Sequence, residues 1–152
     1  MFTLPEEDEQ LTTTEKVYFF MPTGDKGELS VTFNFYDEKS YRQLVEDSGK
    51  REVEKKSLKI SSKLSQKDVP EDELLAAIEE QMDLDLYESD LAILEEAIVD
   101  VVGLYDKKGK PIQYSKELLP RVIKFKQPRI ALMDSFVSIH SEDGRKKAKR
   151  KN

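Results

Sequence analysis

The chain has 152 residues, of which 37% are charged and 38% hydrophobic, and it carries a formal net charge of −6 with no cysteine. This length suits a single domain, and the low apolar share predicts a modest core beneath a heavily solvated surface. The lack of cysteine excludes a disulfide framework, a thiolate nucleophile and a cysteine zinc site. A reducing cytoplasm is the default for a chain without cysteine. No apolar run reaches the roughly 18 residues that indicate a membrane-spanning helix, so we expect no membrane contact.

The sign of the charge changes near the end of the chain. Residues 142–152 hold six basic and two acidic side chains, whereas the rest has a net charge of −10. We interpret residues 141–152 as a disordered basic tail, because charged termini of this kind are commonly solvated. Binding of nucleic acid by counterion release is the alternative. It is the less favoured role, because the tail has no aromatic residue for base stacking and the acidic body repels phosphate.

The first part of the chain predicts a β-hairpin. Residues 1–14 are acidic and rich in threonine, and we expect them to be a flexible lead-in. Residues 17–21 are β-branched or aromatic, and residues 22–27 are dense in turn formers. The next segment alternates polar residues with four apolar ones, Leu29, Val31, Phe33 and Phe35. A period of two gives the hairpin one buried face, which other elements must cover.

A short helix is expected after the hairpin. Asp37 is placed to cap its first turn, and Gly49 to end it. Residues 50–69 are ambiguous, although Leu58–Ile60 is a candidate for a third strand. Residues 15–66 are therefore expected to form a hairpin or small sheet with one short helix.

Helices are expected from residue 68 to residue 140. Asp68 and Pro70 mark the first start, since proline in a first turn forfeits only an amide hydrogen without a partner. Residues 83–89 interrupt this helix, and Ser89 or Asp90 caps the next. That helix, Leu91–Val102, has few polar residues, so we expect it to be the most buried one.

Three further features divide the C-terminal part. Residues 106–109 form a turn, and Ser115 caps a helix that runs to about residue 124. Pro120 lies at its fifth position, where the ring clashes with the preceding turn, so this helix is expected to be short or kinked. Pro128 begins the last helix. The predicted fold is α+β: an N-terminal β-hairpin or small antiparallel sheet packed on a C-terminal bundle of short helices, as one domain over residues 15–140.

No residue pattern indicates catalysis, a cofactor or a metal. His140 is the only histidine, and near the end of a helix it is far more typical of a surface residue or a partner of the C-terminal helix dipole than of a base or ligand. Residues 83–94 superficially resemble a calcium loop, but they lack its central glycine and its last glutamate. We therefore expect a protein that is not an enzyme.

The C-terminal half carries a series of soft motifs. Val101–Val102–Gly103 leads to the turn Asp106-x-x-Gly109, then to Pro111–Ile112, a serine-capped helix rich in leucine and a final helix opened by Pro128. In this order of elements, and in its N-terminal hairpin, the chain resembles the phage tail assembly chaperones, small proteins encoded upstream of the tape measure protein. Residues 15–47 and 90–140 carry the resemblance. Residues 48–88 are longer and more charged than expected, and a tryptophan common near residues 104–105 is missing.

The resemblance implies a non-catalytic role in phage morphogenesis. Such a chaperone binds the tape measure protein, keeps it soluble, and helps to recruit tail tube subunits. It acts in the host cytoplasm and is absent from the mature virion. Self-association is also open. The alternatives are a structural tail component, such as a terminator or completion protein, and a small regulatory adaptor whose basic tail binds nucleic acid.

Two surfaces are candidates for binding a partner. A groove between short helices would hold an amphipathic helix, and the free edge of the hairpin would accept a partner strand. The apolar residues that we single out for the groove are Leu74, Ile78, Ile93, Leu118, Ile123 and Phe136. The alternative for each of them is an ordinary place in the core.

Overall fold

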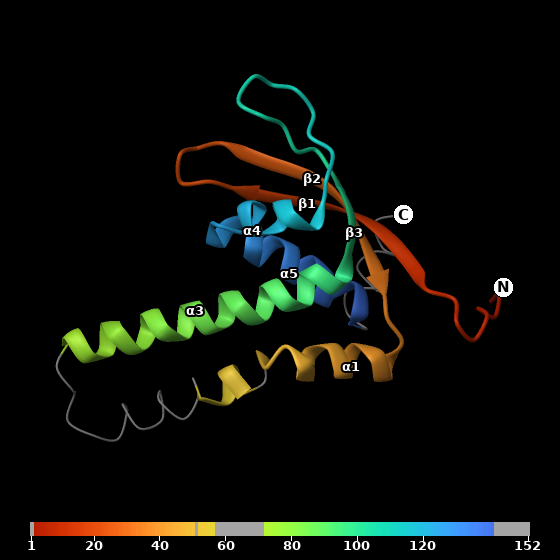
Figure 1. Cartoon of the computed structure of the whole chain (residues 1–152), viewed down its shortest axis with the longest axis horizontal. Helices are drawn as coiled ribbons and strands as arrows, with labels where there is room; N and C mark the ends of the chain where they lie inside the picture. Colours follow the sequence, from red (N-terminus) through yellow and green to blue (C-terminus); the bar gives the residue numbers. More distant parts are fainter. Residues whose placement is uncertain (1, 51, 57–71, 142–152) are drawn as a thin grey trace.

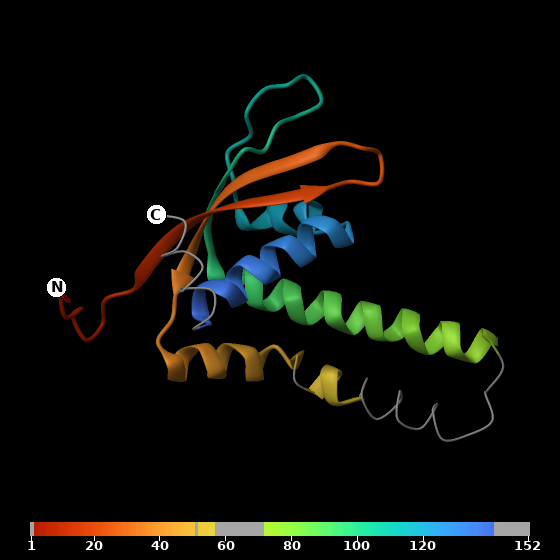
Figure 2. The ribbon, with the colours of Figure 1, turned by 180° about the vertical axis from the view of Figure 1, so that it is seen from behind.

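The computed structural model describes residues 2–50, 52–56 and 72–141. Its fold is α+β, with a three-stranded antiparallel sheet of order β1-β2-β3 and helices packed against it, as shown in Figure 1 and, from behind, in Figure 2. The elements are β1 (Leu11–Phe20), β2 (Lys26–Phe35), α1 (Glu38–Asp47), α3 (Asp72–Ala97), β3 (Ile98–Val102), η1 (Lys116–Leu118), α4 (Leu119–Val122) and α5 (Lys126–His140).

The predicted hairpin is confirmed as β1 and β2. The strands pair from Leu11↔Phe35 to Phe20↔Lys26, and the turn between them is closed by a hydrogen bond of 2.8 Å from Met21 N to Asp25 O. The expectation that residues 11–14 belong to a flexible lead-in is wrong. These residues pair with β2 because threonine suits a pleated strand, and the hydroxyls of Thr14 and Thr32 lie 2.9 Å apart across the pair.

The third strand comes from a segment that we expected to be helical. Residues 98–102 pair with β2, and Thr32 lies opposite Asp100 while Phe33 lies opposite Ile98, so Val99 is an extra residue in a β-bulge. The bulge turns Ile98 and Val101 to the same buried face. Buried residues three apart are the signature of a helix, which is why the pattern misled the prediction.

Side chains of Asn34 in β2 and of Tyr36, which directly follows β2, donate hydrogen bonds to the end of helix α3. Asn34 Nδ2 and Tyr36 Oη donate to the carbonyl oxygen of Glu96, at 3.0 and 3.1 Å. The last carbonyls of a helix lack partners within the helix. No proline or glycine ends α3 before β3 begins. The hydrogen bonds from Asn34 and Tyr36 instead satisfy a carbonyl group at this end of the helix.

Helix α3 is continuous, so the predicted break at residues 83–89 and the cap at Ser89 or Asp90 are wrong. Both residues are buried inside the helix, where Ser89 Oγ donates to Leu86 O. Asp90 accepts from Lys50 Nζ at 2.8 Å and from Arg129 Nη1 at 2.6 Å. The buried carboxylate is thereby paired and joins α3 to α5. The predicted start at Asp68–Pro70 and the candidate strand Leu58–Ile60 lie outside the described residues.

Local signals performed better elsewhere. Asp37 caps α1 as predicted, because its Oδ1 accepts from Ser40 N at 2.7 Å, and this backbone hydrogen bond lowers the pKa of Asp37. The helix with Pro120 is short, as predicted: η1 is followed by a single turn, α4. Ser115 occupies the N-cap position of η1 but makes no capping hydrogen bond with its side chain. The last helix begins just before Pro128, at Lys126.

The core lies between one face of the sheet and the helices. Figure 1 shows α3, α4 and α5 on the same side of the sheet. The rings of Phe33 and Phe136 meet at 5.8 Å between centroids. The buried apolar residues are Val17, Leu29, Val31, Phe33, Ile93, Leu94, Ala97, Ile98, Val101, Leu119, Ile123, Leu132, Met133 and Phe136. The expected tail at residues 142–152 lies outside the described residues.

Candidate partner-binding site

The structure separates the residues that we singled out for a groove. Ile93, Ile123 and Phe136 are fully buried, each at 0% exposure, so they belong to the core and offer no surface to a partner. Leu118 and Ile78 are half-buried, and the side chain of Leu74 lies outside the described part of the chain. Helical spacing finds apolar faces, but it does not distinguish a face packed against the sheet from one left open.

The free edge of the hairpin is present on β1. The sheet order makes β1 an edge strand, paired on one side with β2. No described residue forms a backbone hydrogen bond with the other side of residues 12–20. An edge strand of this kind presents backbone N–H and C=O groups to a partner.

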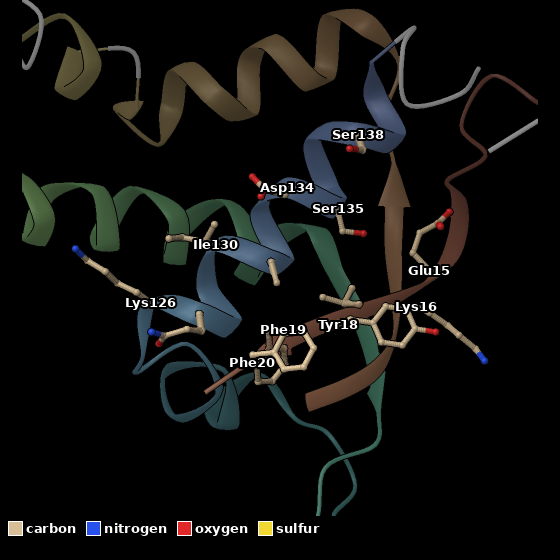
Figure 3. Close-up of a pocket in the computed structure, with 13 residues that line it drawn as sticks. Glu15, Lys16, Tyr18, Phe19, Phe20, Lys126, Ile130, Asp134, Ser135 and Ser138 are labelled. Carbon is tan, nitrogen blue, oxygen red and sulfur yellow. The ribbon is translucent and has the colours of Figure 1, made fainter. Parts of the chain in front are cut away.

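A groove of about 870 Å³ runs between β1 and α5. Figure 3 shows Phe19 and Phe20 of β1 on one side, with Ile130 of α5 on the other. The side chain of Ile130 is 47% exposed although it is apolar, and Phe20 is 67% exposed. Lys126, Ile130 and Asp134 follow one another at helical spacing of four, so they present one stripe of α5 to the groove.

The polar groups around the groove are scattered. Lys126 Nζ pairs with Asp83 Oδ2 at 3.2 Å, and both side chains are about half exposed, so the pair contributes little to stability. Glu15 Oε1 accepts from Thr13 Oγ1 at 3.1 Å. These groups do not converge on one point in the groove. Apolar walls with dispersed charge suit the side chains of another polypeptide.

His140 lies in the last turn of α5, the position of a partner for the helix end, and its side chain is half-buried instead of lying on the open surface. Its Nε2 accepts a hydrogen bond from Tyr36 N at 2.9 Å, and its Nδ1 lies 2.9 Å from Phe136 O. Its ring stacks on Tyr41 at 4.7 Å and on Phe35 at 5.1 Å between centroids. The imidazole therefore joins the end of α5 to the end of β2 and to α1.

Other titratable groups are perturbed mainly by burial. Burial raises the pKa of Tyr114, and the nearby carboxylates of Glu95 and Asp100 act in the same direction. Burial also raises the pKa of Tyr36, against the hydrogen bond with Asn34. Among the described residues, no three or more potential ligands gather into a metal site. No helix in the described ranges is long and apolar enough to cross a membrane.

The groove was missed at the level of sequence, although two signals for it exist. Tyr18 and Phe20 are apolar residues on the strand face that does not reach the core. Ile130 lies at helical spacing with the charged Lys126 and Asp134, which places it on the polar side of α5. Apolar residues in positions that pattern rules assign to solvent indicate an interaction surface.

Comparison of the chain with models of protein families, with curated proteins and with solved structures finds no match.

Proposed function

We propose that this protein is a phage tail assembly chaperone, which binds the tape measure protein, keeps it soluble and helps to recruit tail tube subunits. The resemblance of residues 15–47 and 90–140 to that family supports the proposal. The observation that carries it is the groove between β1 and α5, because a chaperone of this kind needs an apolar surface that stays open in the free protein.

The shape of the groove suits an amphipathic segment of a long partner. Phe19 and Ile130 offer apolar contacts, and the groove opens to solvent along one side (Figure 3). A partner segment can place its apolar side chains against these residues while its polar side remains in water. The unpaired edge of β1 adds hydrogen-bonding groups beside the same groove.

The charge of the chain is compatible with many copies on one partner. The net charge is −6, so neighbouring copies repel one another at long range. This repulsion opposes self-aggregation when apolar surfaces are crowded together. It leaves a contact with an apolar partner segment unaffected.

The test is co-expression with the long helix-rich protein encoded immediately downstream of the gene for this chain. The native chain is expected to keep that protein soluble and to copurify with it. Ile130→Asp places a charge in the groove at an exposed position, so it should abolish copurification while thermal unfolding of the chaperone itself changes little. Leu84→Asp is the matched control, because Leu84 is an exposed apolar residue of a helix, at 58%, outside the groove.

Three results would contradict the proposal. The first is a downstream protein that is equally soluble without the chain. The second is equal loss of copurification in both variants, which would mean that the groove is not the binding site. The third is recovery of the chain in fixed copy number from purified phage tails, which would assign it to the structural components.

A further inference from the structure

A second hollow, of about 670 Å³, lies at the hairpin-turn end of the sheet. Its apolar walls come from Phe19 and Met21 of the hairpin, Tyr105 after β3, and Val122 and Phe125 near α4. In Figures 1 and 2 the loop after β3 and α4 lie at the same end of the molecule as the hairpin turn. We call this feature the hairpin-end hollow. Phe19 lines both it and the groove beside α5, so the two adjoin at that ring.

Exposed aromatic rings surround the hairpin-end hollow. Tyr105 is 64% exposed and Phe125 is 53% exposed, and both line it. Phe19 also lines it, whereas the exposed Phe20 lines the adjoining groove. Tyrosine and phenylalanine are enriched in the buried centres of protein interfaces. Several such rings around one concave surface therefore indicate an interface with a protein.

Two lysines lie over aromatic rings near the hollow. Lys26 lines the hollow but lies over Tyr18 and Phe20, which line the adjoining groove, and Lys124 lies over Phe125. Lys26 Nζ is 5.9 Å from the ring centres of both Tyr18 and Phe20, and Lys124 Nζ is 6.0 Å from that of Phe125. Neither ammonium group forms an ion pair with any described residue. The aromatic faces attract the cations and keep them beside the apolar surface. An incoming carboxylate would meet them there.

The segment that closes this end of the molecule is basic, unlike the rest of the folded body. Residues 101–126 have seven basic and two acidic side chains, a net charge of +5, whereas the chain outside this segment and residues 142–152 has a net charge of −15. The basic residues of the segment are Lys107, Lys108, Lys110, Lys116, Arg121, Lys124 and Lys126. Tyr105 and Phe125 belong to this basic segment, and Lys124 lies over the ring of Phe125, although none of the seven basic side chains lines the hollow itself.

We propose that the hairpin-end hollow binds an acidic amphipathic segment of another protein. Apolar side chains of that segment enter between Tyr105 and Phe125, and its carboxylates pair with Lys26 and Lys124. Complementary charge of this kind fixes the register of an interface and accelerates association. The hollow adjoins the groove at Phe19, but the inference rests on other residues and does not depend on the proposed function.

A polypeptide suits this surface better than a nucleic acid. Glu28 lines the hollow and pairs with Lys16 at 3.8 Å, so acidic groups interrupt the basic surface. Single-stranded nucleic acids require a continuous positive track for regularly spaced phosphates. The strongly acidic remainder of the chain also repels a polyanion at long range. Carboxylates in a peptide are sparse and can lie opposite the two lysines alone.

The test measures binding of labelled peptides to the full chain by fluorescence anisotropy. The probe is a synthetic amphipathic peptide with glutamates on its polar face and leucine and phenylalanine on the other. Its matched partner has lysine in place of each glutamate. The acidic peptide should bind, and added salt should weaken its binding. The lysine peptide and an oligothymidylate should bind weakly.

Two variants locate the binding surface. The first double variant is Tyr105→Ala with Phe125→Ala, and the second is Lys26→Glu with Lys124→Glu. Each should weaken binding of the acidic peptide by about tenfold or more. Lys39→Glu with Lys55→Glu makes the same change in net charge away from the hollow and should have little effect. The groove variant Ile130→Asp should bind the acidic peptide as the native chain does. Binding at the hollow is thereby distinguished from binding at the groove.

Any of four outcomes would overturn the inference. The acidic peptide fails to bind, or it binds no better than the lysine peptide. Both hollow variants, shown to be folded by their thermal transitions, bind the acidic peptide as the native chain does. Alternatively, the oligothymidylate binds more tightly than the acidic peptide and loses affinity in the same variants, which would assign the surface to nucleic acid.

Discussion

Among the described residues, the hydroxyl of Tyr114 is the one buried side-chain polar group without a hydrogen-bond partner. Burial and the charges of Glu95 and Asp100 raise its pKa. A buried hydroxyl without a partner loses its contact with water and gains nothing in return.

Tyr114→Phe should therefore raise the free energy of unfolding by about 1 kcal/mol, because it removes that uncompensated group and keeps the ring. Urea unfolding at neutral pH measures the change. A decrease of similar size would show that the hydroxyl has a partner that stabilises the fold.

The same residue contributes to the response to alkali. A raised pKa in the folded state means that the stability due to the neutral phenol is complete below about pH 10 and is lost as the pH rises above that value. Tyr114→Phe should lose less stability than the native chain over that range. Tyr36 has a raised pKa in both proteins, so a residual loss is expected in each.

The role of a single residue could be predicted where its hydrogen-bond partner lies nearby in the sequence, and not where the partner is distant. Asp37 caps α1 through Ser40, three residues away, and the cap was read directly from the sequence. The partner of His140 is the amide of Tyr36, which is 104 residues away. No local pattern reports a contact of that kind, so the sequence indicated only a surface residue or a partner of the helix end.

At the scale of elements, the largest error came from β3. Ile98, Val101 and Val102 have helical spacing, and the preceding residues are a true helix. The bulge at Val99 produces the spacing within a strand, and the side chains of Asn34 and Tyr36 receive the helix end. Both causes involve β2 or the residue directly after it. Asn34 and Tyr36 precede Glu96 by 62 and 60 residues, so a local rule cannot detect them. The confirmed hairpin needed only neighbouring residues.

The Asp90 cluster explains why α3 continues through residues that looked like a break. Asp90 is 5% exposed and pairs with Lys50 and Arg129, whose side chains are 20% and 8% exposed. Asp90→Asn leaves the buried Arg129 and the partly buried Lys50 without a counter-charge, so it should destabilise the fold by about 3–5 kcal/mol.

Asp83→Asn supplies the control for that prediction. It breaks the exposed pair with Lys126 on the same helix, and its effect should stay below about 1 kcal/mol. Chemical denaturation compares the two variants. Equal effects would mean that burial of the Asp90 cluster does not determine its contribution.

For the whole molecule, the packing predicts unequal local stability. Strand β2 is paired on both sides and supplies buried Leu29, Val31 and Phe33, whereas α1 has no buried residue. Amide hydrogens of β2 should therefore exchange most slowly with solvent, and those of α1 much faster. Hydrogen exchange followed by mass spectrometry or NMR measures this order. Equal protection of α1 and β2 would indicate a single cooperative unit.

The α+β class and the hairpin followed from the sequence, but the two concave surfaces did not. Periodicity identified Ile93, Ile123 and Phe136 as apolar, and the fold used them in the core. The groove and the hairpin-end hollow are assembled from β1, α5 and the segment after β3, which are distant in sequence. The relative placement of these elements depends on the complete three-stranded sheet, which no single segment of the sequence specifies.

The return of β3 to β2 has a consequence for synthesis. A nascent chain is made from its N-terminus, so both strands of the hairpin emerge long before residues 98–102 exist. Until then the edge of β2 that later pairs with β3 is free, and the apolar face with Val31 and Phe33 is not yet covered by the helices. During translation β2, the central strand of the finished sheet, is therefore an edge strand for a time. Its free edge can then pair with other newly made chains.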